Sequence, residues 1–287
     1  MGPQTAVELN DASVTLPTLA ELGPDLNHTS RTQQWVTLGR PFVAIGVYIA
    51  LAQLGWWPLA PIAVFFVFVT VVTATHDVVH RSLGLSRRAT DWWLFILGGL
   101  LGASGHSYRA THLRHHAVFP GPDDPEGHPA RMTFWQSVLQ GPVFLAKLWV
   151  WSYRRANDGG AKAWLLAEAS VAPLALIIGF TLWPQSIWPS SFGLLAYVVM
   201  VINGAWVFPL MTVHLPHRGY GETPLTQTHT VRDPIISRLF LELTYHLEHH
   251  LFPSVPTHNL AELAKRLEPA LEKHGVVPQR LFFRQRA

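Results

Sequence analysis

Two long stretches of the chain carry no charged side chain, and they set the expected architecture. Residues 41–75 contain no Asp, Glu, Lys or Arg, and Gly-Trp-Trp-Pro from Gly55 interrupts them near the middle. Residues 169–217 repeat the pattern, with a break at Trp183-Pro-Gln-Ser-Ile-Trp-Pro. Because a helix needs about 20 residues to cross a hydrocarbon core of roughly 30 Å, each stretch has room for two spans joined by a turn. The pattern predicts an all-α integral membrane protein with four transmembrane helices in two hairpins.

The hairpins divide the chain into five segments. We expect an N-terminal segment (1–40), a first hairpin (41–80), a connecting segment (81–168), a second hairpin (169–217) and a C-terminal segment (218–287). The connecting segment holds a short glycine-rich apolar piece, Trp92 to Gly105, which predicts a half-helix or an interfacial segment. In the C-terminal segment, leucines at helical spacing predict an amphipathic helix that Gly275 ends. These are Leu260, Leu263, Leu267 and Leu271.

The positions of the basic residues predict the orientation in the membrane. Of the 21 Lys and Arg, 2 lie up to residue 40, 10 between residues 81 and 168, and 9 from residue 218 onward. The turns of the two hairpins contain none. By the positive-inside rule, all three basic segments are expected on the cytoplasmic side, where they form a helical cap. The first forty residues have no apolar core of the kind found in signal peptides, so the spans themselves are expected to direct insertion.

The amino-acid composition excludes several classes of functional site. Apolar residues make up 49% of the chain and charged residues 14%, against about 25% charged in an ordinary soluble domain. The absence of cysteine excludes a disulfide framework, a thiolate zinc site, a cysteine-ligated iron–sulfur cluster and a cysteine nucleophile. The formal charge of +3 does not point to nucleic acid, because the basic residues lie among tryptophans beside apolar runs. A membrane surface explains them better.

Sixteen histidines fall mainly into clusters, which are the strongest candidates for a functional site. The clusters are His76-Asp-Val-Val-His80, His112-Leu-Arg-His115-His116 and His246-Leu-Glu-His249-His250. Residues three and four apart share one face of a helix, so each cluster directs two or three imidazoles to one place. A fourth element, His214-Leu-Pro-His217, ends the last span. The orientation derived from Lys and Arg puts all four elements on the same side of the membrane.

The number of imidazoles implies more than one metal ion. Eight or nine ring nitrogens exceed the four to six positions of a single ion, so the clusters predict a dinuclear site. Imidazole binds zinc, copper, iron and nickel, so the ligand type does not identify the metal. A dinuclear site at a membrane surface is better suited to oxygen chemistry on a lipid than to hydrolysis.

The order HxxxH, HxxHH, HxxHH around two pairs of spans resembles the membrane-bound fatty acid desaturase superfamily, whose desaturases, hydroxylases and ketolases use two iron ions and molecular oxygen. Further motifs are most similar to its carotenoid (β-carotene) hydroxylase and ketolase branch: Asp123-Asp-Pro125, Leu215-Pro-His-Arg218, and Tyr245-His-Leu-Glu-His-His-Leu-Phe-Pro-Ser-Val-Pro256. The His-His-Leu-Phe-Pro run also resembles acyl-lipid desaturases. His214 departs from the pattern, because the branch does not ordinarily have a histidine there.

The resemblance implies a set of metal ligands and an unusual charge balance. By position, the implied ligands are His76, His80, His112, His115, His116, His217, His246, His249 and His250. Nine neutral imidazoles add no negative charge, so two ferrous ions would leave a local charge of +4. Nearby carboxylates are therefore expected to orient the rings and offset the field. By sequence the nearest are Asp77, Asp124 and Glu248.

The sequence leaves several functions open. The first expectation is an O2-dependent oxidoreductase that acts on unactivated C–H bonds of a hydrophobic lipid, with hydroxylation of a carotenoid ring ahead of fatty acyl desaturation. Hydroxylation, desaturation and ketolation differ in how the substrate is placed, which no motif records. A membrane zinc hydrolase is a more distant alternative. A metal transporter is disfavoured, because residues 41–75 and 169–213 hold no charged group near the bilayer midplane.

Oxygen chemistry of this kind also needs two electrons from outside the chain. The sequence has no dinucleotide fingerprint and no recognisable haem domain. A separate donor, ferredoxin-like or similar, is implied. The predicted basic cap offers it a docking surface, with lipid phosphate as the competing partner. The residues are Arg87, Arg88, Arg154, Arg155, Lys265 and Arg266.

Overall fold

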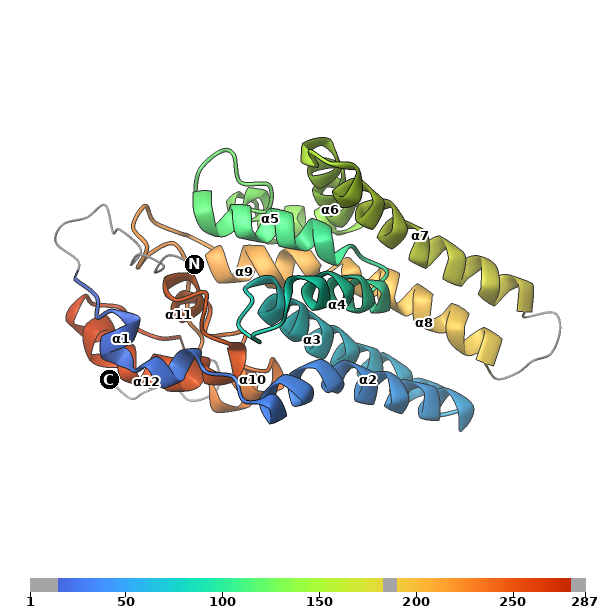
Figure 1. Ribbon diagram of the computed structural model, residues 1–287, viewed down its shortest axis with the longest axis horizontal. Helices are drawn as coiled ribbons and strands as arrows, with labels where there is room; N and C mark the ends of the chain where they lie inside the picture. Colours follow the sequence, from blue (N-terminus) through green and yellow to red (C-terminus); the bar gives the residue numbers. More distant parts are fainter. Residues whose placement is uncertain (1–14, 183–189, 280–287) are drawn as a thin grey trace. The chain divides into compact units, whose positions relative to one another are not determined.

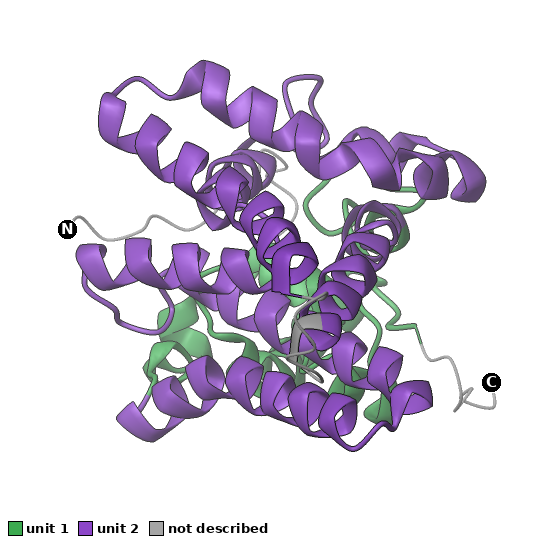
Figure 2. Cartoon of the chain, turned by 90° about the vertical axis from the view of Figure 1, so that its right-hand side faces the viewer, with its two compact units in different colours: residues 1–29, 215–287 green, residues 30–214 purple. Residues whose placement is uncertain are grey.

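The computed structural model describes residues 15–182 and 190–279, and throughout these ranges the secondary structure is helical with no strand (Figure 1). The chain forms two compact units (Figure 2): residues 1–29 with 215–287, and residues 30–214. The predicted all-α class is confirmed. Four helical segments are long and apolar enough to cross a membrane: Arg31–Gln53, Trp57–Val79, Gly159–Leu182 and Phe192–His217.

The first hairpin of the larger unit pairs α2 (Arg31–Gln53) with α3 (Ala60–Val79). Helix α2 begins ahead of the uncharged stretch because Ser30 and Gln33 form a capping box there. The uncharged run therefore marked only the most apolar part of this helix. A short 3-10 turn, Trp57–Leu59, joins the two helices where the sequence predicted a turn.

The second hairpin pairs α7 (Gly159–Leu182) with α8 (Ser190–Ala205). Helix α7 also begins before the uncharged stretch, because the Asp158 carboxylate accepts a hydrogen bond from the Ala161 amide at 2.8 Å. The helix consequently includes Glu168, which is 1% exposed. The predicted break at residues 183–189 lies outside the described residues.

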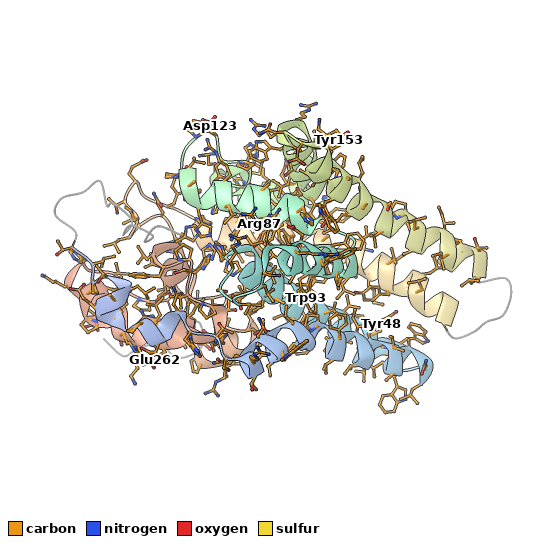
Figure 3. All side chains as sticks on the ribbon, in the orientation of Figure 1. Tyr48, Arg87, Trp93, Asp123, Tyr153 and Glu262 are labelled. Carbon is orange, nitrogen blue, oxygen red and sulfur yellow. The ribbon has the colours of Figure 1, made fainter. Side chains whose placement is uncertain are left out.

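The two hairpins of this unit are joined by direct contacts. Tyr48 of α2, labelled in Figure 3, donates a hydrogen bond from its hydroxyl to the Gly193 carbonyl of α8 at 2.7 Å. Its ring packs against Tyr197, whose hydroxyl in turn donates to the Leu100 carbonyl at 2.6 Å. These bonds matter in an apolar bundle, where a buried hydroxyl without a partner is costly.

Three further helices connect the hairpins. They are α4 (Arg87–Leu100), α5 (Gly105–Val118) and α6 (Phe134–Arg155). The glycine-rich piece at residues 92–105 thus forms most of α4 and the corner into α5. At that corner a Cβ on Gly105 would lie 2.2 Å from the Leu94 carbonyl oxygen. Only glycine permits this approach of α4 and α5, and it fixes the direction in which α5 leaves the corner.

The smaller unit is built around α12 (Leu260–Lys273). The four predicted leucines of this helix are all at most 1% exposed, so the predicted amphipathic face is confirmed. They pack with α11 (His246–Leu251) and with α1 (Leu19–Leu22). Arg266 ties α12 to the N-terminal segment through two bonds of 2.8 Å to the Asp25 carboxylate. The packing holds α11, which carries the third histidine cluster.

Candidate metal centre

In the larger unit, α3 and α5 bring five histidines together. His76 and His80 lie one helical turn apart at the end of α3, with ring centroids 4.8 Å apart. The His112 ring of α5 is 5.2 Å from each of them. His116 is 4.8 Å from His80 and 4.7 Å from His112. His115, on the same helix, is 6.0 Å from His112.

The nitrogen positions fit a metal ion. The Nε2 atoms of His112 and His116 are 3.2 Å apart. Two nitrogens bound to one ion at about 2.1 Å lie roughly 3.0 Å apart at a right angle and roughly 3.4 Å apart at a tetrahedral angle. His76, His80 and His112 also each offer a ligand nitrogen within 4.8 Å of the others.

Carboxylates hold the outer nitrogens of two of these rings. Nδ1 of His115 is 2.7 Å from a carboxylate oxygen of Asp124, and Nδ1 of His112 is 3.1 Å from a carboxylate oxygen of Glu126. A carboxylate at Nδ1 favours the tautomer with hydrogen there, which leaves Nε2 as the electron-pair donor. This arrangement is typical of metal-bound histidine.

The sequence motifs did not indicate Glu126 as a site residue, although it follows Asp123-Asp-Pro within the same acidic run. Its carboxylate accepts a bond from the Thr111 hydroxyl at 2.6 Å, and its amide donates to Asp124 at 2.9 Å. Burial raises the pKa of Glu126 to about 7. The other predicted carboxylate of this unit, Asp77, is 1% exposed and lies 3.9 Å from His76 Nδ1.

The electrostatics of the larger unit favour neutral imidazoles. Burial lowers the pKa of His112 well below its ordinary value, and the neighbouring histidines, His116 first, lower it further. The pKa of His80 is also well below its ordinary value, because of burial and then His76. A neutral ring is the form that binds a metal ion, so the protein itself prepares these side chains as ligands.

In the smaller unit, the third cluster meets His217. The Nε2 atom of His246 lies 3.1 Å from Nε2 of His217 and 3.1 Å from Nε2 of His250. These separations fall in the same range as in the larger unit. Nδ1 of His217 donates to the Gln227 carbonyl at 3.0 Å, so its Nε2 is the electron-pair donor. His249, 2% exposed, lies on the same short helix with its ring 6.1 Å from His246.

Glu248 has a different partner from the one expected. Among the described residues its hydrogen bonds run to Arg232, whose Nε and Nη2 donate to Oε1 at 2.9 and 2.7 Å. Arg232 also lies 3.4 Å from the Glu268 carboxylate of α12. Glu248 is fully buried. The ion pair holds α11 in place, and Arg232 is a further residue that the sequence motifs did not indicate.

His214 and His217 differ in their surroundings. The chain between them is irregular, because a π-helical turn, η5 (Leu210–His214), is followed by the short helix α9 (Leu215–His217). His214 is 3% exposed, and its Nδ1 donates to the Pro129 carbonyl at 3.0 Å. A π-turn re-aims side chains and is frequent at functional sites.

His106 belongs to a second buried cluster that the sequence did not indicate. Its Nδ1 is 2.7 Å from the Glu168 carboxylate of α7, which also accepts a hydrogen bond from Ser104. Its Nε2 lies 3.6 Å from Asp91, which pairs with Arg109 at 2.8 Å. This chain of contacts links α4, α5 and α7. It accounts for a carboxylate inside a candidate span.

Two residues of the expected basic docking surface are engaged in other contacts. Arg266 pairs with Glu262 at 2.9 Å as well as with Asp25. The Arg155 guanidinium lies over the Trp151 ring, 4.4 Å from its centroid.

Comparison with known proteins agrees with this geometry. Residues 54–281 match the fatty acid desaturase family. The chain is 26% identical over 263 residues to Fatty acid desaturase 3 of Homo sapiens, covering 77% of this chain and 57% of the relative. It is 29% identical over 192 residues to the Beta-carotene ketolase of Paracoccus sp., covering 63% of this chain and 68% of the relative. An Acyl-lipid (9-3)-desaturase of Physcomitrium patens is 29% identical over 100 residues, covering 33% of this chain and 18% of the relative.

The matched range covers most of the chain, so the protein belongs to the fatty acid desaturase family. The resemblance stated from the histidine motifs is confirmed at this level. The chain spans a little over half the length of the human Fatty acid desaturase 3 that it matches.

Proposed function

We propose that this protein is an integral membrane oxidoreductase that holds two iron ions and uses O2 to oxidise C–H bonds of a hydrophobic lipid. The observation that carries the proposal is the arrangement of the imidazoles in each unit. Nε2 atoms of neighbouring rings lie 3.2 Å apart in the larger unit and 3.1 Å apart in the smaller one. Nδ1 of His112 and of His115 is bonded to a carboxylate oxygen, and Nδ1 of His217 to a carbonyl oxygen. The proposed ligands are the nine histidines that the motifs indicate, namely His76, His80, His112, His115, His116, His217, His246, His249 and His250.

Iron, when bound, would supply the oxygen chemistry that an unactivated C–H bond requires. The chain's own residues have three tasks in the proposal. The imidazoles bind the ions, Asp124 and Glu126 orient two rings of the larger unit, and Arg232 with Glu248 supports the helix that carries three rings of the smaller one. Asp77 adds negative charge beside the ligands, whereas Arg232 balances the charge of Glu248. Two electrons come from a separate donor, and we place the centre on the cytoplasmic side, where the positive-inside rule puts the histidine clusters.

The first candidate reaction is hydroxylation of a carotenoid ring. The Asp-Asp-Pro and Leu-Pro-His-Arg motifs support it, as does the similarity to a protein named Beta-carotene ketolase. Fatty acyl desaturation is the second candidate, supported by the similarity to Fatty acid desaturase 3 and to an acyl-lipid desaturase. Ketolation shares the substrate of the first reaction and differs in the number of oxidation steps.

Expression in a host that makes β-carotene separates these reactions. We expect new oxygenated pigments by liquid chromatography and mass spectrometry, and an unchanged fatty acid profile. A host carrying the His112→Ala variant is the control for endogenous oxidation. Unchanged pigments together with new double bonds in the acyl chains would overturn the carotenoid assignment and establish the desaturase.

The two neighbouring histidines of the fourth element give a local test of the ligand assignment. We expect His217→Ala to lose most activity and part of the iron, because its Nε2 lies 3.1 Å from that of His246. His214→Ala is expected to keep its iron and change only rate or product ratio, because its ring bonds the Pro129 carbonyl. Iron per protein is measured for both variants beside the unmutated protein. Loss of iron only in His214→Ala would reverse the assignment.

A further inference from the structure

The larger unit contains a cavity of about 370 Å³, a size in the range of small-molecule sites. It lies among α3, α4, α5, α6, α7 and the end of α8. Its wall is mostly apolar and includes Val71, Leu97, Leu101, Leu148, Trp149 and Phe208. Val71 and Leu97 are fully buried and Leu148 is 4% exposed, so the cavity reaches the interior of the bundle.

Small residues and fixed helices keep this space open. Gly102, Ala146, Ala169 and Ala205 line it and contribute at most one methyl group each. The indole nitrogen of Trp149, on α6, donates to the Leu165 carbonyl of α7 at 3.0 Å. That bond fixes one wall of the cavity relative to another. Collapse onto the small residues would therefore require whole helices to move.

The rim of the cavity is suited to hydrocarbon. Its exposed lining residues include Gly102, Ala146, Val150 and Ala169, none of which is polar. Glu168 is the one carboxylate in the described wall, and its oxygens are engaged by Ser104 and His106. In a chain whose helices cross a membrane, an apolar rim admits lipid more readily than a water-soluble ligand.

One end of the cavity reaches the histidines. Thr75, in the wall, directly precedes His76, and Tyr108, also in the wall, lies one helical turn before His112. The Tyr108 ring stacks on the His112 ring, with centroids 4.8 Å apart and planes at 21°. The Tyr108 ring also makes a T-shaped contact with the Phe208 ring, with centroids 6.4 Å apart. Tyr108 therefore separates the cavity from a proposed metal ligand.

We propose that this cavity receives the hydrocarbon part of the lipid substrate, and that Tyr108 is a positioning residue that determines which carbon is presented for oxidation. The second half of this proposal rests on the proposed function. The first half concerns binding of a lipid hydrocarbon chain, which does not require that the lipid is oxidised. A shift of about 1 Å in the reacting carbon changes rates by up to about a hundredfold, so a side chain at this end controls the site of reaction.

Binding is tested by photolabelling of protein in nanodiscs with a phosphatidylcholine whose acyl chain carries a diazirine. We expect labels on peptides with the buried residues Val71 and Leu97, in addition to the exposed faces of the spans. Ala169→Phe should reduce labelling of the buried positions at least about fivefold, because it narrows the rim. Ala167→Phe is the matched control, since Ala167 is also exposed on α7 but does not line the cavity. Equal labelling in the two variants, or none at the buried positions in unmutated protein, would overturn the proposal.

Positioning is tested by the products of Tyr108→Phe and Tyr108→Leu. We expect Tyr108→Leu to retain its iron and to move the oxidised position by one or more carbons, read by mass spectrometry, while Tyr108→Phe keeps the original position because the ring remains. Unchanged products from Tyr108→Leu would overturn the positioning role. Labelling of the cavity in a protein that oxidises no lipid would refute the proposed function and leave the binding site intact.

Discussion

Replacing His112 by alanine is expected to lower activity by at least about a hundredfold and to remove a large part of the bound iron. His112 lies close to three other proposed ligands of the larger unit: the rings of His76 and His80 at 5.2 Å, and Nε2 of His116 at 3.2 Å. Loss of such a ligand costs more than loss of a supporting residue, for which about 10–100-fold is typical.

Iron per protein and product formation are measured together, with His128→Ala as control. His128 lies in the same connecting segment but is exposed and outside the histidine clusters. Thermal unfolding of both variants separates lost metal from lost fold. Full iron content in His112→Ala would contradict its assignment as a ligand.

Glu126→Ala is expected to weaken iron retention and activity by about 10–100-fold, although Glu126 is no proposed ligand. Its carboxylate lies 3.1 Å from Nδ1 of His112 and 2.6 Å from the Thr111 hydroxyl. Without it, the ring loses the partner that fixes its tautomer. Glu126→Gln should recover part of the loss, because an amide oxygen still accepts from Nδ1.

The control for this variant is Asp123→Ala. Asp123, labelled in Figure 3, belongs to the same acidic run, but its side chain is 82% exposed. The measurement is the rate of iron loss to a chelator, which reports on the site without turnover. A rate for Glu126→Ala equal to that for Asp123→Ala would show that Glu126 does not support the centre.

The sequence predicted the elements well where one physical signal dominated. Uncharged runs identified the four candidate spans, and the leucine spacing identified the buried face of α12. The first residues of the helices were harder to predict, because α2 and α7 extend through charged residues to the capping groups of Ser30 and Asp158. A search for uncharged residues cannot detect such extensions.

The supporting residues of the site were harder to predict than the histidines. Asp124 was named because it follows its cluster closely, and it does lie 2.7 Å from His115. Arg232 lies 16 residues before Glu248 and outside the histidine motif, so no local pattern pairs the two residues. The cluster of His106 and Glu168 spans 62 residues, so no local motif contains it.

The metal content of the purified protein tests the central claim most directly. Protein produced with adequate iron is analysed for iron and zinc by mass spectrometry, with the result expressed per chain. The proposed function predicts two iron ions per chain and little zinc. Two zinc ions without iron would contradict it and favour a membrane hydrolase.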